Sequence, residues 1–397
     1  MTITVMEQEV ISKAVEVAAN VRKRVKETEE TRRIPEATIQ ELKDSGIFKL
    51  LRPERYGGLQ TSVETYSRAI VEISKACAST GWIASLCAIR EIMVAESFNE
   101  KAHDEIFGQN PEEVLFAGVY EPRSCKARKV DGGYLIEDGH WMFCSGSLHA
   151  TWGYFGMYTT NEQGEIVEQL LMTVPFSEVE IEDDWYTLGL RGTGSNAVRM
   201  TNVFVPEHRC ASFVGVLNGK FNSEHLRDIP LYNAALFPCL IISLGLPGLG
   251  VVKEMLDNFA KSLPYRTAQH MGVKMIKDAA STHRLFAEAT LKTETAELFL
   301  MNLARSIDEW ASKNEFMPNE ARLKALADIG YANQLLNEAV QLLLSASGSS
   351  FVYDASPMQR LLRDFMTLSS HRSLSPVITL ENFGRQLSGL EPNQIRY

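Results

Sequence analysis

The spacing of apolar residues changes twice along this chain, and this change limits the folds that it can adopt. Between residues 5 and 110, apolar side chains recur at helical spacing, as Val10, Ala14 and Val17 do. From about residue 230 to the end, the same spacing returns in long runs with few helix breakers, such as 321–344. Two helical regions therefore enclose a region of a different kind.

The region between about 115 and 210 has the pattern of strands. Short runs rich in Val, Tyr, Thr and Phe are separated by turn clusters such as Asp131-Gly132-Gly133. These runs are 113–119, 134–137, 154–159, 169–174 and 198–205. The pattern predicts a β domain of two small packed sheets, built from antiparallel hairpins rather than from βαβ units.

We therefore predict an α+β fold that is mainly α and has three domains. The N-terminal helical domain covers 1–114, the middle β domain covers 115–212, and a C-terminal helical bundle covers 213–397. Long helices with an apolar face commonly need a partner, so the bundle is also expected to carry oligomerisation.

Composition excludes several classes of protein. The 397 residues carry 40 basic and 50 acidic side chains, a net charge of −10 with no basic stripe, which argues against nucleic acid. The six cysteines are widely spaced without a Cys-x-x-Cys pair, which predicts reduced thiols and no metal site. The N-terminus has no basic segment ahead of an apolar run, and no window approaches the ~20 apolar residues of a membrane span, so we expect a cytoplasmic protein that does not bind membranes.

Three constellations could carry chemistry. The first is the segment 139–146, where Trp141 and Phe143 alternate on an expected strand and Ser145 follows. The alternation predicts two aromatic faces on one side of the sheet, suited to stacking a planar ring, with a hydroxyl just beyond them. As bare residues, however, they are more typical of two core aromatics followed by a turn serine.

The second constellation is Gly189-Leu190-Arg191-Gly192-Thr193-Gly194-Ser195. Three glycines with Thr and Ser between them offer free backbone N–H groups and two hydroxyls to an anion or a polar ring edge. The spacing is not that of a dinucleotide-binding fingerprint, because the run leads into a strand rather than a helix. A plain hairpin is the alternative.

The third constellation is His371, which follows Arg363-Asp364 on an expected helix, ahead of the closing Gly389-Leu390-Glu391-Pro392. A lone histidine among apolar neighbours is usually structural. An imidazole can also donate or accept a proton near neutral pH, which makes it a candidate catalytic group.

These three segments together resemble the acyl-CoA dehydrogenase superfamily, and within it the oxygenase components of two-component, reduced-flavin-dependent monooxygenases. The helical, β, helical order and the C-terminal four-helix bundle are those of the acyl-CoA dehydrogenase fold. The dehydrogenases carry a proton-abstracting glutamate about eight residues after the aspartate, where this chain has Arg372. The position before it is His371, as in the oxygenases.

The resemblance implies a reduced flavin cofactor, FMNH2 or FADH2, delivered by diffusion from a separate NAD(P)H:flavin reductase. It implies that the flavin adds O2 to form a C4a-hydroperoxide and passes one oxygen atom to a small aromatic or heteroaromatic substrate. Ser145 and His371 would be the catalytic residues. The cofactor would be held by Trp141, Phe143, Ser145, Arg191, Thr193, Ser195 and Arg266, the last reaching the flavin of a neighbouring subunit in a homotetramer.

The substrate contacts implied are Trp82, Arg90, Tyr120 and His371. Relatives that hydroxylate phenols often carry a histidine near position 90, and this chain has Arg90 there. We expect either an ordinary charge pair, on the surface or between domains, or a clamp for a substrate carboxylate at the mouth of the pocket. Oxygenation of nitrogen or sulfur, acyl-CoA dehydrogenation and a non-catalytic flavin-binding scaffold stay open as alternatives.

Overall fold

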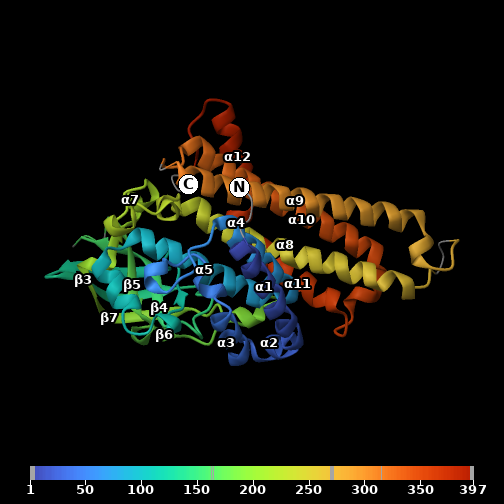
Figure 1. Cartoon of the computed structure of the whole chain (residues 1–397), viewed down its shortest axis with the longest axis horizontal. Helices are drawn as coiled ribbons and strands as arrows, with labels where there is room; N and C mark the ends of the chain where they lie inside the picture. Colours follow the sequence, from blue (N-terminus) through green and yellow to red (C-terminus); the bar gives the residue numbers. More distant parts are fainter. Residues whose placement is uncertain (1–4, 162, 164, 269–271, 314, 394–397) are drawn as a thin grey trace.

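The computed structural model describes residues 5–161, 163, 165–268, 272–313 and 315–393, and it confirms the helical, β, helical order. The β domain lies at one end of the molecule, and the long helices of the bundle extend toward the other (Figure 1). The N-terminal helices lie beside both. They are α1 (Val5–Lys23), α2 (Val25–Thr31), α3 (Glu36–Asp44), α4 (Val63–Ala76), α5 (Ala78–Ser97) and α6 (Glu100–Phe107).

Helix α5 is the central element because it is buried along its whole length. Every one of its 20 residues is buried, including the charged Arg90, Glu91 and Glu96. A helix that is enclosed on all sides lies in the core, and α5 packs against α8 on one side and against β1 of the β domain on another. It therefore brings the helical core into contact with the loops of the β domain.

The strands of the β domain form one 8-stranded sheet in the order β6-β7-β3-β2-β4-β5-β8, with β1 parallel to β4. The prediction of two separate small sheets was wrong in this respect. Only one parallel pair, Ala127 with Thr159, joins β2 to β4, and a hydrophobic core lies among the strands on both sides of this junction. The strands are β1 (Phe116–Ala117), β2 (Ser124–Val130), β3 (Gly133–Trp141), β4 (Trp152–Thr160), β5 (Ile166–Pro175), β6 (Glu180–Ile181), β7 (Val198–Pro206) and β8 (Cys210–Ser212).

The C-terminal helices form the expected bundle, in which α8, α9 and α10 lie side by side and α11 packs on α8 (Figure 1). Pro318 precedes α10 and Gly348 follows it, so a helix-breaking residue stands at each end of this helix. The helices of this part are α7 (Phe213–Leu217), α8 (Leu236–Ser262), α9 (Ala280–Ser312), α10 (Asn319–Ser347), α11 (Pro357–Ser369) and α12 (Pro376–Leu387).

One expectation about apolar runs needs correction. The segment 236–265, which contains α8, is long and apolar enough to cross a membrane by length and composition alone. However, 83% of its most apolar window is buried inside the protein. Burial of this kind is typical of a core helix of a soluble protein, and α8 packs against α4, α5 and α10.

Candidate active site

A chain of hydrogen bonds joins α5 to two loops of the β domain. Trp82 Nε1 donates to Ser145 Oγ at 3.0 Å, and Ser145 Oγ lies 2.6 Å from Ser195 Oγ. Ser195 Oγ lies 2.7 Å from Thr193 Oγ1, which donates to the Leu190 carbonyl at 2.8 Å. The side chains of Trp82, Ser145, Thr193 and Ser195 are buried. The structure therefore brings together four predicted site residues from three distant segments.

The direction of each bond in this chain follows from counting protons, because every hydroxyl has only one. Thr193 gives its proton to the Leu190 carbonyl and must accept from Ser195, which then accepts from Ser145. Ser145 thus gives its proton to Ser195 and receives the indole N–H of Trp82. One lone pair is left on Ser145 Oγ, so this oxygen acts toward a ligand as an acceptor.

The turn that carries Ser145 is shaped by two left-handed residues. Phe143 has φ +64° and Gly146 has φ +84°. The N–H of Gly146 donates to the Thr193 carbonyl at 3.1 Å, which ties the turn to the segment 189–195, called the glycine loop below. As a result, Phe143 points outward with 66% of its surface exposed, while Ser145 points inward. Trp185 meets the Phe143 ring edge to face at 6.1 Å.

Trp141 does not belong to the site, and this prediction was wrong. Its side chain is 0% exposed inside the β domain, where its ring lies 5.3 Å from that of Phe155. Its indole N–H donates to the Gly156 carbonyl at 2.9 Å. Strict alternation would place Trp141 and Phe143 on one face, but the left-handed backbone of Phe143 ends the regular strand.

The glycine loop is held against α11 by the Arg363-Asp364 pair. Asp364 accepts the N–H of Leu190 at 2.7 Å, and Leu190 has a left-handed φ of +52°. Gly189 packs so closely on α11 that an added Cβ would lie 2.1 Å from the Arg363 carbonyl. Arg363 donates to the Leu188 carbonyl at 2.7 Å. Burial raises the pKa of Asp364 to about 6, against the opposing pull of neighbouring arginines. In the sequence, Asp364 served only to locate His371 by its spacing. The sequence did not predict that Asp364 holds the glycine loop in place.

His371 stands just after α11 and faces the same region. Its ring centroid lies 6.2 Å from that of Trp82. Nδ1 accepts the N–H of Ser373 at 3.2 Å, so the neutral imidazole carries its proton on Nε2, which can donate. The side chain is accessible to solvent, yet desolvation by the surrounding protein lowers the pKa of the imidazole.

Arg90 is deep in the protein, which corrects the location that both expectations gave it, while a role toward a substrate carboxylate stays a prediction. Its side chain is 5% exposed, so it lies neither on the surface nor at a pocket mouth. Glu91 pairs with Arg52 at 2.7 Å rather than with Arg90. Arg90 Nη2 donates to the Gly118 carbonyl at 2.7 Å, two residues before Tyr120. Tyr120 is partly buried.

The two remaining predicted cofactor residues lie elsewhere. Arg191 lines a separate pocket of about 1000 Å³ between α1, α2 and the start of α11, 4.0 Å from Glu29. Arg266 follows α8 and donates to the Ser347 carbonyl. Arg266 thus joins the segment after α8 to the turn after α10, and α8 ends at the end of the bundle away from the β domain (Figure 1). Their place agrees with a role toward another subunit and not toward Ser145 of the same chain.

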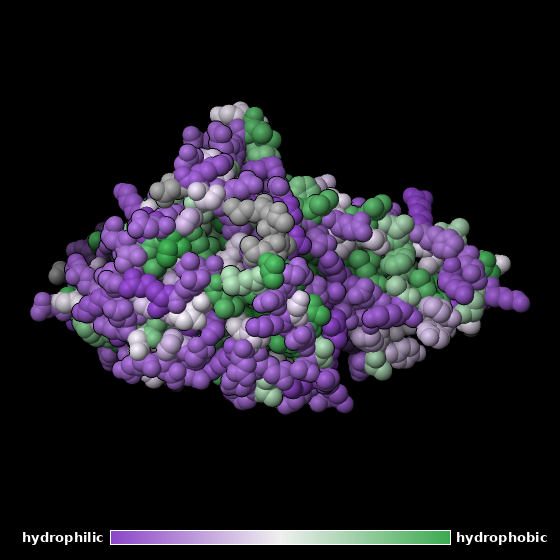
Figure 2. Space-filling view, in the orientation of Figure 1, coloured by the Kyte–Doolittle hydropathy of each residue, from purple (hydrophilic) through white to green (hydrophobic). Residues whose placement is uncertain are grey.

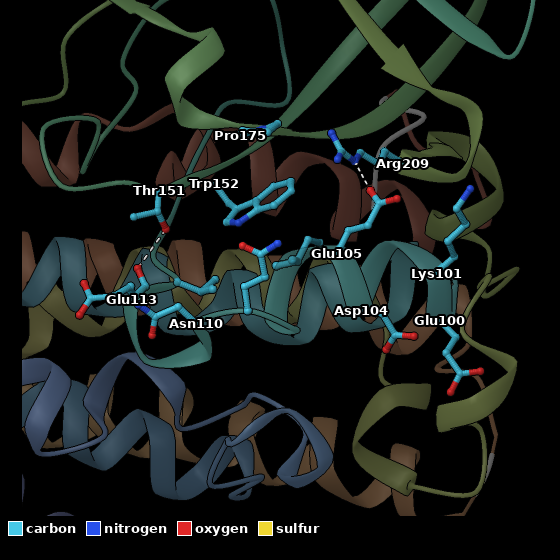
Figure 3. A pocket seen from close by; sticks show the side chains of 13 residues that line it. Glu100, Lys101, Asp104, Glu105, Asn110, Glu113, Thr151, Trp152, Pro175 and Arg209 are labelled. Carbon is cyan, nitrogen blue, oxygen red and sulfur yellow. Dashed lines mark hydrogen bonds and ion pairs between the residues drawn. The ribbon is translucent and has the colours of Figure 1, made fainter.

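A pocket of about 920 Å³ on α6 and the β domain includes none of the predicted site residues (Figure 3). Its wall carries the acidic Glu100, Asp104 and Glu105, and Glu105 pairs with Arg209 at 2.7 Å beside Trp152. The acidic groups and the satisfied ion pair give this pocket no evident part in the chemistry around Ser145.

Comparison with known proteins agrees with this geometry. Residues 6–100 match the acyl-CoA dehydrogenase N-terminal domain, and residues 242–376 match the acyl-CoA dehydrogenase C-terminal domain. The architecture is therefore that of the acyl-CoA dehydrogenases.

More specific relatives are oxygenases. The oxygenase subunit HsaA of a flavin-dependent monooxygenase from Rhodococcus jostii is 30% identical over 93% of this chain and 96% of its own length. The oxygenase component of p-hydroxyphenylacetate 3-hydroxylase from Acinetobacter baumannii is 26% identical over 96% of this chain and 90% of its own. The structure of XiaF from Streptomyces sp. in complex with FADH2 and glycerol superposes with a TM-score of 0.93, at 27% identity, over 99% of this chain and 98% of XiaF. This chain belongs to the family of oxygenase components of flavin-dependent monooxygenases.

Proposed function

We propose that this enzyme binds reduced flavin with its N5 edge at Ser145 and oxygenates a small aromatic or heteroaromatic substrate. The observation that carries the proposal is the direction of the hydrogen bonds that run from Ser145 through Ser195 to Thr193. This direction leaves Ser145 Oγ as an acceptor for a ligand. Reduced flavin presents an N–H at N5, whereas oxidised flavin presents a lone pair there. The site is therefore complementary to the reduced form.

The exposed Phe143 ring and the glycine loop are the surfaces on which we place the flavin ring. Phe143 is 66% exposed beside Trp185, and Thr193 and Ser195 lie behind Ser145. When bound, reduced flavin would supply the electrons that activate O2, and one atom of that O2 would reach the substrate. The protein would supply the orientation of the ring and the exclusion of water.

His371 is the residue that we assign to proton transfer. Its Nε2–H is a donor in the neutral imidazole, and the lowered pKa keeps that form present at neutral pH. The carboxyl group nearest in sequence is Asp364, which is buried and engaged with Leu190. Nothing in this arrangement favours a dehydrogenase base.

The partners follow from membership of this family. We propose a separate NAD(P)H:flavin reductase, transfer of FMNH2 or FADH2 by diffusion, and action in the cytoplasm. A homotetramer formed through the bundle is supported by exposed apolar side chains on α9 and α12, including Leu291 at 62%, Leu298 at 68% and Val377 at 77%. Figure 2 shows hydrophobic patches over the part of the molecule that the long helices occupy.

The test of the site is an anaerobic titration of the protein with reduced and oxidised flavin. The wild type is expected to bind the reduced form more tightly, and Ser145→Ala to lose most of that discrimination because the acceptor at N5 is gone. Ser147→Ala is the matched control, since Ser147 is equally buried in the same turn but donates to the Gly194 carbonyl. Equal affinity of the wild type for both redox forms would contradict the proposal.

A further inference from the structure

Arg90 is a buried cation that has no counter-ion among the residues that the structure describes. Nη2 donates to the Gly118 carbonyl, but Nη1 is buried and has no hydrogen-bond partner among the described residues. None of the ion pairs among the described residues includes Arg90, and its neighbour Glu91 pairs with Arg52 instead. A buried guanidinium that lacks both a partner and an opposite charge is costly, so such groups are usually found where a ligand completes them.

The acidic groups nearest to Arg90 along α5 do not neutralise it. Glu91 is committed to Arg52 through a two-pronged contact at 2.7 and 2.9 Å. Glu96 is 0% exposed and forms no ion pair with Arg90 among the described residues, and burial raises the pKa of its carboxyl well above the ordinary value. The positive charge of Arg90 is therefore left for another group to balance.

Tyr120 and Tyr154 lie within electrostatic reach of Arg90, and Tyr120 offers a hydroxyl donor. Burial raises the pKa of Tyr120 and of Tyr154, and the charge of Arg90 acts on both in the opposite direction. The Tyr120 hydroxyl donates to the Met93 sulfur at 3.0 Å, a weak acceptor that a ligand oxygen could replace. A second donor is thus available beside the guanidinium.

Arg90 lies on the same helix as Trp82, the residue that contacts Ser145. Arg90 follows Trp82 by eight residues on α5, a rise of about 12 Å along the helix axis. Both side chains point toward the β domain, since Trp82 donates to Ser145 and Arg90 donates to Gly118. Arg90 therefore lies on the same side of α5 as the contact between Trp82 and Ser145, further along the helix.

We propose that the preferred substrates are aromatic acids, whose carboxylate is bound by Arg90 Nη1 and the Tyr120 hydroxyl while the ring lies near Trp82 and Ser145. This inference rests on the proposed oxygenase function, because that function places the reacting ring beside Ser145. It makes Arg90 a specificity-determining residue rather than a structural one.

The test compares matched acids and amides. Calorimetry would measure the binding of 4-hydroxyphenylacetate and 3-(4-hydroxyphenyl)propionate, each beside its neutral primary amide, to the wild type and to Arg90→Met and Arg90→Lys. The wild type should bind at least one acid about 10- to 100-fold more tightly than its amide, the range expected for a charge-assisted contact. Arg90→Met should bring that ratio close to one, and Arg90→Lys should leave a reduced preference because the charge stays and the planar fork is lost.

The matched control is Arg227→Met, which removes a part-buried arginine that contacts Asn233 at 2.7 Å. This variant should keep the acid-to-amide ratio of the wild type. If Arg90 were only structural, Arg90→Met would lower the melting temperature and leave the ratio unchanged. A ratio near one in the wild type, or a preference that survives in Arg90→Met, would overturn the inference.

A second measurement separates this inference from the proposed function. Product and peroxide would be quantified after mixing the reduced-flavin complex with oxygen and each ligand. Oxygenation of neutral phenols without preference for the acids would leave the function standing and reject the anion site. Acid binding that depends on Arg90, with peroxide as the only product, would reject the function and retain the anion site.

Discussion

Asp364→Asn is expected to remove a pH dependence from the stability of the protein. The carboxyl of Asp364 is 2% exposed and accepts the N–H of Leu190, and burial raises its pKa to about 6 from an ordinary value of 3.8. A group whose pKa is higher in the folded state stabilises the fold fully below the unfolded pKa and loses this contribution as the pH rises through the folded pKa. The window therefore runs from about pH 4 to about pH 7.

The magnitude follows from the shift. A difference of about two pKa units at 1.36 kcal/mol per unit amounts to roughly 3 kcal/mol between the ends of the window. Asparagine has no proton to release, and its carbonyl oxygen can still accept the N–H of Leu190. Asp364→Asn should therefore exceed the unfolding free energy of the wild type by roughly 1 kcal/mol at pH 4.5 and by roughly 3 kcal/mol near pH 8.

The assay is urea unfolding, followed by tryptophan fluorescence, of both proteins from pH 4.5 to 8. The difference between the two curves cancels the other titrating groups, which both proteins share. Asp308→Asn is an instructive control, because burial also raises the pKa of Asp308 to about 6. Both of its oxygens accept backbone N–H groups, from Val63 and Glu64, so asparagine loses one bond and should destabilise. Parallel pH curves for Asp364→Asn and the wild type would refute the reasoning.

Three further outcomes follow from the site. His371→Ala should still bind reduced flavin but lower oxygen transfer by about 10²-fold, with peroxide as the main product, and a wild-type product yield would exclude His371 from proton transfer. Ser195→Ala should free the proton of Ser145, so anaerobic titration should show weaker discrimination between reduced and oxidised flavin; unchanged discrimination would show that the proton order does not matter. Gly189→Ala places a Cβ 2.1 Å from a backbone carbonyl of α11 and should cost about 1–3 kcal/mol of stability in thermal unfolding, whereas Gly384→Ala, with nothing within 4 Å, should not destabilise.

The order of helices and strands was readable from the sequence because it depends on local patterns. Helical spacing predicted the regions around α1 and α10, and short β-rich runs predicted most of β4, β5 and β7 and part of β3. The strand β2 escaped because its sequence is mostly polar and most of its residues stay at least partly exposed, so it carries no apolar run. The family resemblance, not the periodicity, pointed to the chemistry. The boundaries at 114 and 212 stay a prediction.

The tertiary structure alone decided which residues meet. Trp82, Ser145 and Ser195 come from segments about 50 or more residues apart, and only their packing shows the shared hydroxyl chain. The same holds for burial, since alternation along a strand gives a face but cannot reveal the left-handed turn that separates Trp141 from Phe143. Whether a charge has a partner is likewise a property of three-dimensional neighbours, because electrostatic and hydrogen-bond contacts depend on distance in space and not on separation along the chain.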